Sequence, residues 1–509
     1  MNRRKFLVSS LASSACRAVR GGTLEAFAQA SLREQLMRDP LRPQFHLLPR
    51  ANWMNDPCAP RFFRGQYHMF FQYNPGAAVW GDMHWAHATS PDLIHWKHMP
   101  VALSPTPGSY DAYGCFTGSV LAGAEIPSIL YTGVTKCSPQ EETIRGEGLR
   151  EVQCLATSAD PDLRSWTKLR EPVLASPPPG LRVTGFRDPC PWKDGDTWYL
   201  GVGSGFNKVG GAVLLYTSPD GRNWTYLHPL AQGKWNEGTK TNPVATGEMW
   251  ECPDFFPLDD KHVLLYSTEG KVYWEVGTFG KPDLRFHAET RGLLDHGSYY
   301  AMKSMVDAKG RRILWGWVQE TRSPDECRAA GWAGAMALPR VLSLGPDNKL
   351  RMEIPPEFAS LRNAAQKLQG PQSSAMLATA LTGMPIKNRA GEMICRFKVG
   401  QSACGMELRA GTTLLFSIHY DGGVGSTPSA TVGGKTVPLS PDRDGVSSVH
   451  LFIDGSIIET LIDSQEMMTA RCYAPSPGGI QVAWTGPPDA LKSLEVAGVT
   501  PISNDRLTS

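Results

Sequence analysis

The 509-residue sequence has no excess of either charge and no pattern of metal-binding residues. Its 51 basic residues balance 49 acidic ones, which argues against a nucleic-acid groove or a polyanionic partner. None of the 11 cysteines forms a Cys-x-x-Cys pair, and no group of histidines and carboxylates has metal-ligand spacing. We therefore expect neither a metal nor another cofactor. Disulfides stay open, because cysteine spacing does not define their pairing.

Long apolar runs and long helical periodicity are also missing. Beyond the N-terminus, no segment approaches the roughly 20 apolar residues of a membrane span, so we expect no transmembrane helix. The chain is instead rich in turn-forming and aromatic residues, with 51 Gly, 40 Pro and 15 Trp. This composition suits an all-β protein that handles carbohydrate.

Residues 1–30 predict an export signal. The segment Asn2-Arg3-Arg4-Lys5-Phe6-Leu7 resembles twin-arginine signals. An apolar-to-small stretch follows, and Ala28-Gln29-Ala30 offers a small-x-small cleavage site. We therefore expect an exported protein, periplasmic or secreted. The alternative is a basic, unstructured N-terminus, since Arg17 and Arg20 interrupt the apolar stretch.

From about residue 45, short strands alternate with turns, which predicts an all-β protein. In the first part of the chain the predicted strands are Tyr67–Tyr73, Ser128–Gly133, Thr197–Val202, Val213–Thr217, Val263–Ser267 and Arg312–Val318. In the last part they are Met393–Val399, Thr413–Tyr420, Val449–Ile453, Ile457–Ile462 and Ile480–Trp484. We interpret residues 40–345 as one β domain, 346–369 as a mixed linker for which a helix stays an option, and 370–503 as a β-sandwich. Residues 427–444 are polar and turn-rich.

A turn followed by an aromatic residue repeats along the first domain. Ser90–Trp96 recurs as Ser158–Trp166 and Ser218–Trp224, with a weaker copy at Lys281–Phe286, so the spacing is about 60 to 70 residues. A period of this kind predicts a radial repeat, a β-propeller of four or five blades. The repeated Asp and Trp residues are then expected to build the turns of the blades rather than to catalyse.

Three carboxylates stand apart from these turns. Asp56, Asp188 and Glu251 each lie beside a proline or cysteine and close to an aromatic residue, and each falls in a different repeat. Equivalent loops of different propeller blades converge on one end of the central channel. Three acids that are distant in the sequence can therefore meet in one funnel.

At these residues the chain resembles glycoside hydrolase family 32, the β-fructofuranosidases. The resemblance covers nearly the whole mature chain, and its blocks occur in the family's order. They are Trp53-Met54-Asn55-Asp56-Pro57, Gln72-Tyr73-Asn74-Pro75, Trp80–Trp85, Phe116-Thr117-Gly118-Ser119, Arg187-Asp188-Pro189, Glu251-Cys252, Tyr300-Ala301, Leu314–Trp317, Leu338-Pro339-Arg340 and Phe452–Glu459. The resemblance implies a five-bladed β-propeller followed by a C-terminal β-sandwich.

It also implies retaining hydrolysis of terminal fructosyl units of sucrose or fructans such as inulin and levan. Asp56 would be the nucleophile, Glu251 the general acid/base and Asp188 a stabiliser of the transition state. The candidate substrate-binding residues are Trp53, Asn55, Gln72, Trp80, Phe116, Ser119, Arg187 and Trp317. In the sandwich, Asp454 and Glu459 are expected to bridge to other elements.

The chain departs from the family pattern at Cys58-Ala59-Pro60, where the motif usually continues with Asn-Gly. The segment Gln232–Gly247 also looks inserted and is expected to rim the pocket. Three alternatives stay open: a fructosyltransferase using sucrose as donor, a non-catalytic fructan-binding protein, and the propeller arabinosidases and xylosidases. The protein could be a monomer or a homodimer.

Overall fold

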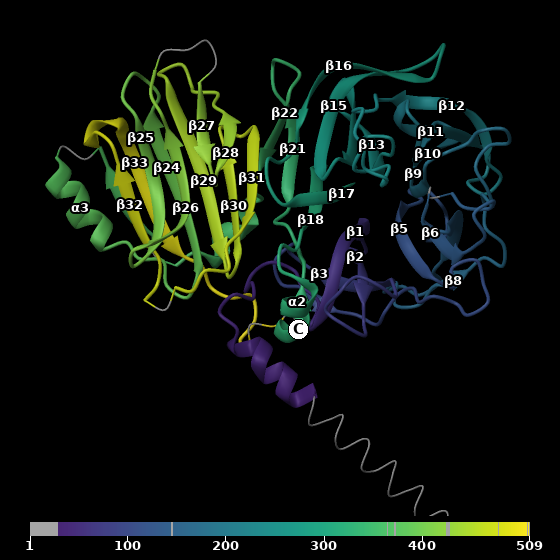
Figure 1. Cartoon of the computed structure of the whole chain (residues 1–509), viewed down its shortest axis with the longest axis horizontal. Helices are drawn as coiled ribbons and strands as arrows, with labels where there is room; N and C mark the ends of the chain where they lie inside the picture. Colours follow the sequence, from purple (N-terminus) through teal and green to yellow (C-terminus); the bar gives the residue numbers. More distant parts are fainter. Residues whose placement is uncertain are drawn as a thin grey trace, which may run out of the picture.

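The computed structural model describes residues 29–143, 146–363, 365–370, 373–423, 428–476, 478–505 and 507. It consists of two β-rich bodies that lie side by side (Figure 1). Residues 1–28, which hold most of the predicted export signal, lie outside the described residues, so export stays a prediction. Within the described ranges, no helix is both long and apolar enough to cross a bilayer.

Five sheets form the first body, and each begins with an innermost strand. The innermost strands β1, β5, β9, β13 and β17 contact one another in ring order. The five sheets therefore form a five-bladed propeller. Blade by blade, the strands are β1 (Asn52–Phe63), β2 (Gln66–Asn74), β3 (His84–Ser90) and β4 (Lys97–His98); β5 (Gly114–Val120), β6 (Ser128–Lys136), β7 (Leu149–Thr157) and β8 (Thr167–Lys168); β9 (Phe186–Asp194), β10 (Thr197–Phe206), β11 (Gly210–Ser218) and β12 (Thr225–Gln232); β13 (Glu251–Leu258), β14 (Lys261–Thr268), β15 (Lys271–Gly280) and β16 (Arg285–Leu293); β17 (Tyr299–Val306), β18 (Arg312–Val318), β21 (Arg340–Leu344) and β22 (Leu350–Glu353).

The ring is closed by a short excursion of the fifth blade. After β18 the chain forms α2 (Pro324–Ala330), β19 (Trp332–Ala333) and β20 (Ala335–Met336). Strand β19 adds to the first blade, where it pairs in parallel with the start of β1. Strand β20 pairs with β18. The chain of the fifth blade thus contributes one strand to the first blade, and backbone hydrogen bonds join the two.

The repeated turn lies at the same place in four blades, between the third and fourth strands. In the first blade, Asp92 Oδ1 accepts hydrogen bonds from the backbone N–H groups of Ile94 (3.0 Å) and His95 (2.9 Å). Asp220 makes the same pair of bonds in the third blade. The structure confirms that these aspartates build turns.

The fifth blade extends beyond residue 345, the predicted end of the first domain. The turn at residues 345–349 connects β21 to β22, and β22 completes this blade. The predicted linker also contains β23 (Gln366–Gln369), which joins the sandwich. Both strands are only four residues long, which is the lower limit for recognising alternation in the sequence.

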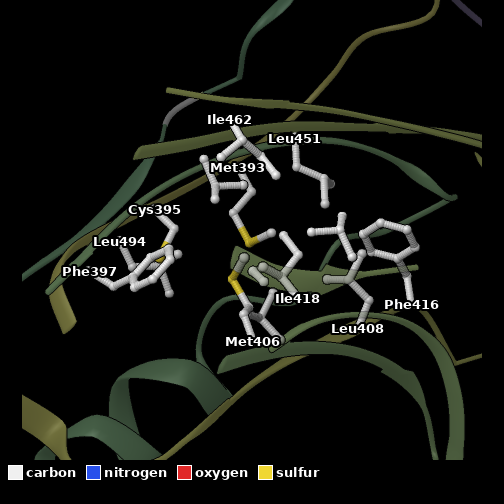
Figure 2. Close-up of a cluster of buried hydrophobic side chains, with 14 of the residues drawn as sticks. Met393, Cys395, Phe397, Met406, Leu408, Phe416, Ile418, Leu451, Ile462 and Leu494 are labelled. Atoms are coloured by element: carbon white, nitrogen blue, oxygen red, sulfur yellow. The ribbon is translucent and has the colours of Figure 1, made fainter. Parts of the chain in front are cut away.

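Two packed sheets form the second body. One contains β23, β33 (Leu491–Gly498), β24 (Ala390–Lys398), β29 (Val446–Asp454), β30 (Ile457–Ile462) and β31 (Glu466–Arg471). The other contains β28 (Lys435–Pro438), β27 (Ser429–Val432), β26 (Thr413–Tyr420), β25 (Cys404–Ala410) and β32 (Gln481–Thr485). Their facing side chains form an apolar core (Figure 2). Strands β27 and β28 lie in the stretch that the sequence indicated to be turn-rich. Short helices α3 (Ser374–Thr382), η1 (Pro356–Leu361) and η2 (Pro488–Ala490) flank the sheets.

Buried charges connect the two bodies. His46, in the segment before β1, contacts Asp454 (2.7 Å) and Glu459 (3.0 Å) of the sandwich through its two ring nitrogens. Glu459 also accepts hydrogen bonds from the Leu338 backbone (2.7 Å) and from Arg340 (3.2 Å). The expectation that Asp454 and Glu459 bridge to other elements is confirmed.

Candidate active site

An open cavity of about 430 Å³ lies among the innermost strands of the propeller. All its lining residues belong to the propeller. They are Asn55, Asp56, Gln72, Trp80, Phe116, Glu147, Leu149, Arg187, Asp188, Asn242, Val244, Ala245, Glu251, Cys252, Gly270, Tyr300, Trp317 and Gln319. The three carboxylates singled out in the sequence therefore share one cavity.

Local irregularities of the innermost strands position these groups. Each of the five strands is interrupted by a register shift with one extra residue relative to its neighbour. In β1, Asn55 and Asp56 together face the single residue Gln72. In β9, Asp188 and Pro189 together face the single residue Val202, and Asp188 adopts a left-handed backbone with φ of 64°. Bulges of this kind redirect side chains out of the regular alternation, here toward the cavity.

Asp56 is held by donors from three strands. Its Oδ1 accepts a hydrogen bond from the Asn55 side chain (3.0 Å), and its Oδ2 accepts one from the Thr117 hydroxyl (2.5 Å). The Cys252 thiol lies 3.4 Å from the same Oδ2. Gln72 completes the network, since its amide contacts both Asn55 (3.1 Å) and Thr117 (2.5 Å). The orientation of the Asp56 carboxylate is thereby defined.

Glu251 lies between a cation and a phenol. Arg187 donates two hydrogen bonds to Glu251 Oε1, at 2.8 and 3.2 Å. The Tyr300 hydroxyl donates to Glu251 Oε2 at 2.6 Å. Asp188, the residue after Arg187, accepts a hydrogen bond from the Cys252 backbone N–H at 2.7 Å. The neighbours Arg187 and Asp188 on β9 therefore form hydrogen bonds with the neighbours Glu251 and Cys252 on β13.

The cavity is strongly acidic. Four carboxylates line it, those of Asp56, Glu147, Asp188 and Glu251, and Arg187 is the one Lys or Arg among the lining residues. Burial, together with the charges of Glu251 and Asp56, raises the pKa of Asp188 to about 7 although Arg187 opposes the shift. Burial also raises the pKa of Asp56, with Glu251 adding to the effect. Each of these two carboxyl groups therefore keeps its proton up to a higher pH than the same group in water.

Six of the eight predicted substrate-binding residues line the cavity: Asn55, Gln72, Trp80, Phe116, Arg187 and Trp317. Trp53 does not; it lies beside Trp317, and its indole N–H donates to Asn55 Oδ1 (2.8 Å). Ser119 also does not, and lines a different cavity together with Arg61 and Arg312. The register shift between Phe116 and Gly118 explains the error, because it directs Thr117 toward Asp56 and Ser119 away.

Sequence reasoning missed Thr117, Tyr300 and Glu151 as parts of the site. The first two lay inside blocks that matched the family, so their position was available but their role was not. Glu151 accepts a hydrogen bond from Arg187 Nη1 at 2.9 Å and lies on a strand with no recognised motif. Nothing in the sequence near Glu151 indicated this contact.

The departure at Cys58-Ala59 lies directly under the nucleophile candidate. Cys58 is fully buried, and its thiol lies 3.5 Å from the backbone oxygen of Asp56. Ala59 is also fully buried and adopts a left-handed backbone, with φ of 42°. An L-residue pays a steric cost there that glycine avoids. The bulged backbone is therefore kept without the glycine.

The apparently inserted segment before β13 reaches the cavity, as expected. Its residues Asn242, Val244 and Ala245 line one side, next to Gly270 of the β14–β15 turn. The Val244 backbone oxygen accepts hydrogen bonds from Glu269 N (3.0 Å) and the Thr268 hydroxyl (3.1 Å). This rim is thereby attached to the fourth blade.

Three carboxylates that converge on an open, partly aromatic cavity of a five-bladed propeller define the class of this protein: it is a glycosidase. More narrowly, the chain belongs to glycosyl hydrolase family 32. The family model described as "Glycosyl hydrolases family 32 N-terminal domain" matches residues 46–354, a range that ends directly after β22.

Relatives of known name support this assignment along most of the chain. A sucrose-6-phosphate hydrolase of Escherichia coli is 34% identical over 86% of this chain and 90% of its own length. A cell-wall isozyme of β-fructofuranosidase from Zea mays is 36% identical over 67% of this chain and 60% of its own. The crystal structure of fructan 1-exohydrolase IIa from Cichorium intybus superposes with a TM-score of 0.74 at 26% identity, covering 91% of this chain and 98% of that one.

Proposed function

We propose that this glycosidase releases terminal non-reducing β-D-fructofuranosyl units from sucrose or fructans by double displacement. The observation that carries the proposal is that two carboxylates of one cavity have different kinds of hydrogen-bond partner. Asp56 is oriented by Asn55 and Thr117, whereas Glu251 is held by Arg187 and Tyr300. Retaining glycosidases need such a pair, with one carboxylate as nucleophile and the other as acid and then base.

Each group has a role in this mechanism. Asp56 attacks the anomeric carbon, and Glu251 protonates the leaving oxygen and then activates water for hydrolysis of the fructosyl-enzyme. Asp188 hydrogen-bonds fructose hydroxyls, and these bonds strengthen as the ring flattens toward the oxocarbenium-like transition state. Trp80, which is 48% exposed, offers an aromatic face at the cavity.

The charge of the cavity favours a neutral sugar. The one cation among the lining residues, Arg187, already contacts Glu151 and Glu251. A phosphorylated sugar would meet four carboxylates without a free cation from this set, and like charges disfavour binding. This supports sucrose or fructan ends as substrates rather than the phosphorylated sugar in the name of the bacterial relative.

The test is incubation of the purified protein with sucrose, sucrose 6-phosphate, inulin, levan and an arabino-oligosaccharide, with analysis of the released sugars. Free fructose from the unphosphorylated fructosides, absent with Asp56→Ala and Glu251→Ala, is the expected result. Initial release of the β-anomer, observed by NMR, would support retention. Elongated fructans would indicate a transferase, arabinose release a different specificity, and binding without turnover would refute the enzymatic proposal.

Export is a separate proposal that rests on the N-terminal residues. The maize relative is named a cell-wall isozyme, which agrees with an extracytoplasmic location for part of the family. Replacing Arg3 and Arg4 by lysine should retain the protein in the cytoplasm if the twin-arginine pathway exports it. Unchanged export of this variant would contradict the proposal.

A further inference from the structure

Glu151 is a fully buried carboxylate outside the cavity. It lies on β7 of the second blade and is 0% exposed. Its Oε2 accepts hydrogen bonds from the Phe186 backbone N–H (2.6 Å) and the Thr143 hydroxyl (3.2 Å), and its Oε1 accepts one from Arg187 (2.9 Å). Donors from its own blade and from β9 therefore hold this carboxylate against the guanidinium.

Arg187 lies between Glu151 and Glu251. Its Nη1 donates a hydrogen bond to Glu151, and its Nη2 and Nε donate to Glu251. Burial opposes the charge of Arg187, but Glu151, Glu251 and Asp188 together hold its pKa well above its ordinary range. A buried guanidinium paired with Glu251 alone would strongly stabilise the carboxylate form of that acid.

The charge of Arg187 thus opposes the role of Glu251 as an acid, and Glu151 can offset that charge. A general acid must be protonated when the substrate binds, yet Arg187 favours its ionised form. We propose that Glu151 is a positioning residue that orients Arg187 and offsets its charge, so that Glu251 holds its proton until the leaving oxygen is in place. This inference rests on the proposed function, in which Glu251 is the acid.

Other groups around Glu251 act in both directions. From four blades and its own strand they are Arg187, Asp188, Asp56, Tyr300, Cys252 and Glu147. The neighbouring carboxylates favour the protonated form of Glu251, whereas Arg187 and the Tyr300 hydroxyl favour the anion. Glu151 differs from the other carboxylates because it acts through Arg187 and does not line the cavity.

The test is the pH profile of kcat/KM for Glu151→Gln, which keeps the shape of the side chain and removes its charge. The alkaline limb should move to lower pH by about one unit, the size expected when a close charge is no longer compensated. Glu151→Asp keeps the charge but draws it back from Arg187, so its limb should move in the same direction by less than the full unit. Glu141→Gln is the matched control, because it removes an exposed carboxylate of the same blade and should leave the limb in place.

An activity-independent measurement separates this inference from the proposed function. Infrared titration follows the protonated carboxyl band that disappears in Glu251→Gln, and this band should titrate at lower pH in Glu151→Gln. A folded Glu151→Gln whose limb and band are both unshifted overturns the inference. A wild type that releases no fructose overturns the proposed function, and the infrared titration still decides the role of Glu151.

If Glu151→Gln does not fold, a second variant tests the same inference. Thr143→Val removes one donor to Glu151 and leaves its charge, so the carboxylate is held less firmly against Arg187. The band should then shift in the same direction by less than the full unit. No shift in a folded Thr143→Val would refute the role of Glu151.

Discussion

The innermost strands of the propeller and the core strands of the sandwich differ in where their pairing is interrupted: at or beside cavity residues in the propeller, and only near strand ends in the β24–β33 and β25–β26 pairs of the sandwich. In the sandwich, β24 and β29 pair without interruption from Ala390 to Lys398, and side chains such as Met393 and Leu451 point into an apolar core (Figure 2). In the propeller every innermost strand is interrupted at or beside a residue that lines the cavity, and β1 is interrupted twice. Uninterrupted pairing directs apolar residues inward, whereas the interruptions turn polar groups toward the cavity.

The largest effect should come from removing the acid of the irregular region. Glu251→Gln should lower kcat by about 10²–10⁴-fold, because acid and base catalysis is lost. Its stability should not fall, since the variant removes one of several close carboxylates. Paired measurements of kcat and chemical denaturation check this. A large loss of stability would show that the charged centre also maintains the fold, and the contrast with the sandwich would fail.

The regular region should behave in the opposite way. Leu451→Ala should destabilise the protein by about 2–5 kcal/mol, since it leaves a cavity in a packed core. The kcat of the folded protein should be unchanged. Leu414, on the same sandwich but 48% exposed, supplies the control, and its replacement by alanine should change stability by about 0.5 kcal/mol or less. Reduced kcat in folded Leu451→Ala would show that the core also tunes the site.

The junction of the two regions should depend on pH. Burial alone would lower the pKa of His46, but hydrogen bonds to Asp454 and Glu459 raise it to about 9. The stabilisation is therefore fully present below about pH 6.5 and is lost as pH rises through about 9. It amounts to about 3 kcal/mol. Urea denaturation over this range should show the loss in the wild type.

Two histidine variants identify the source of that pH dependence. His46→Gln should flatten the curve of stability against pH. His95→Gln, at an exposed position, should leave the wild-type curve unchanged. A wild type with equal stability at both ends of the range would refute a charged His46.

The smallest effect should come from one alanine-to-glycine change made in each region. Ala430→Gly, at a buried position on β27, should cost about 1–2 kcal/mol through lost packing and added chain entropy. Ala59→Gly loses the same methyl group but relieves a left-handed backbone, so stability should change by about 0.5 kcal/mol or less. Chemical denaturation of both variants measures the difference. Equal costs would mean that the bulge at Ala59 carries no strain.

The same regularity decides what could be predicted. Alternation identified strands such as Thr413–Tyr420 and Ile457–Ile462 with the bounds that the structure has. The turn repeats predicted the propeller, because each turn is stabilised by local hydrogen bonds that short motifs encode. Family blocks identified the residues of the three carboxylates that meet in the cavity, although their catalytic roles stay proposals.

The features that the sequence did not predict depend on register shifts within strands and on contacts between blades. The family resemblance proposed Ser119 as a substrate-binding residue, but the extra residue in β5 turns Thr117 toward Asp56, and Ser119 lines a different cavity. The contact of Glu151 with Arg187 joins neighbouring blades, so no local pattern encodes it. Backbone irregularity and non-local pairing were the two kinds of information that the sequence patterns did not carry.

The parallel pairing of β19 with β1 has a consequence for where the chain could be cut. This pairing closes the ring of blades through a short parallel ladder, in which Asn52 lies opposite Trp332 and Trp53 opposite Ala333. A circular permutant with new ends in the exposed turn after Ser218 would leave the pairing of β19 with β1 intact. New ends between α2 and β19 would leave β19 attached to the last blade through β20 alone, so this closure of the ring would depend on one chain connection instead of two.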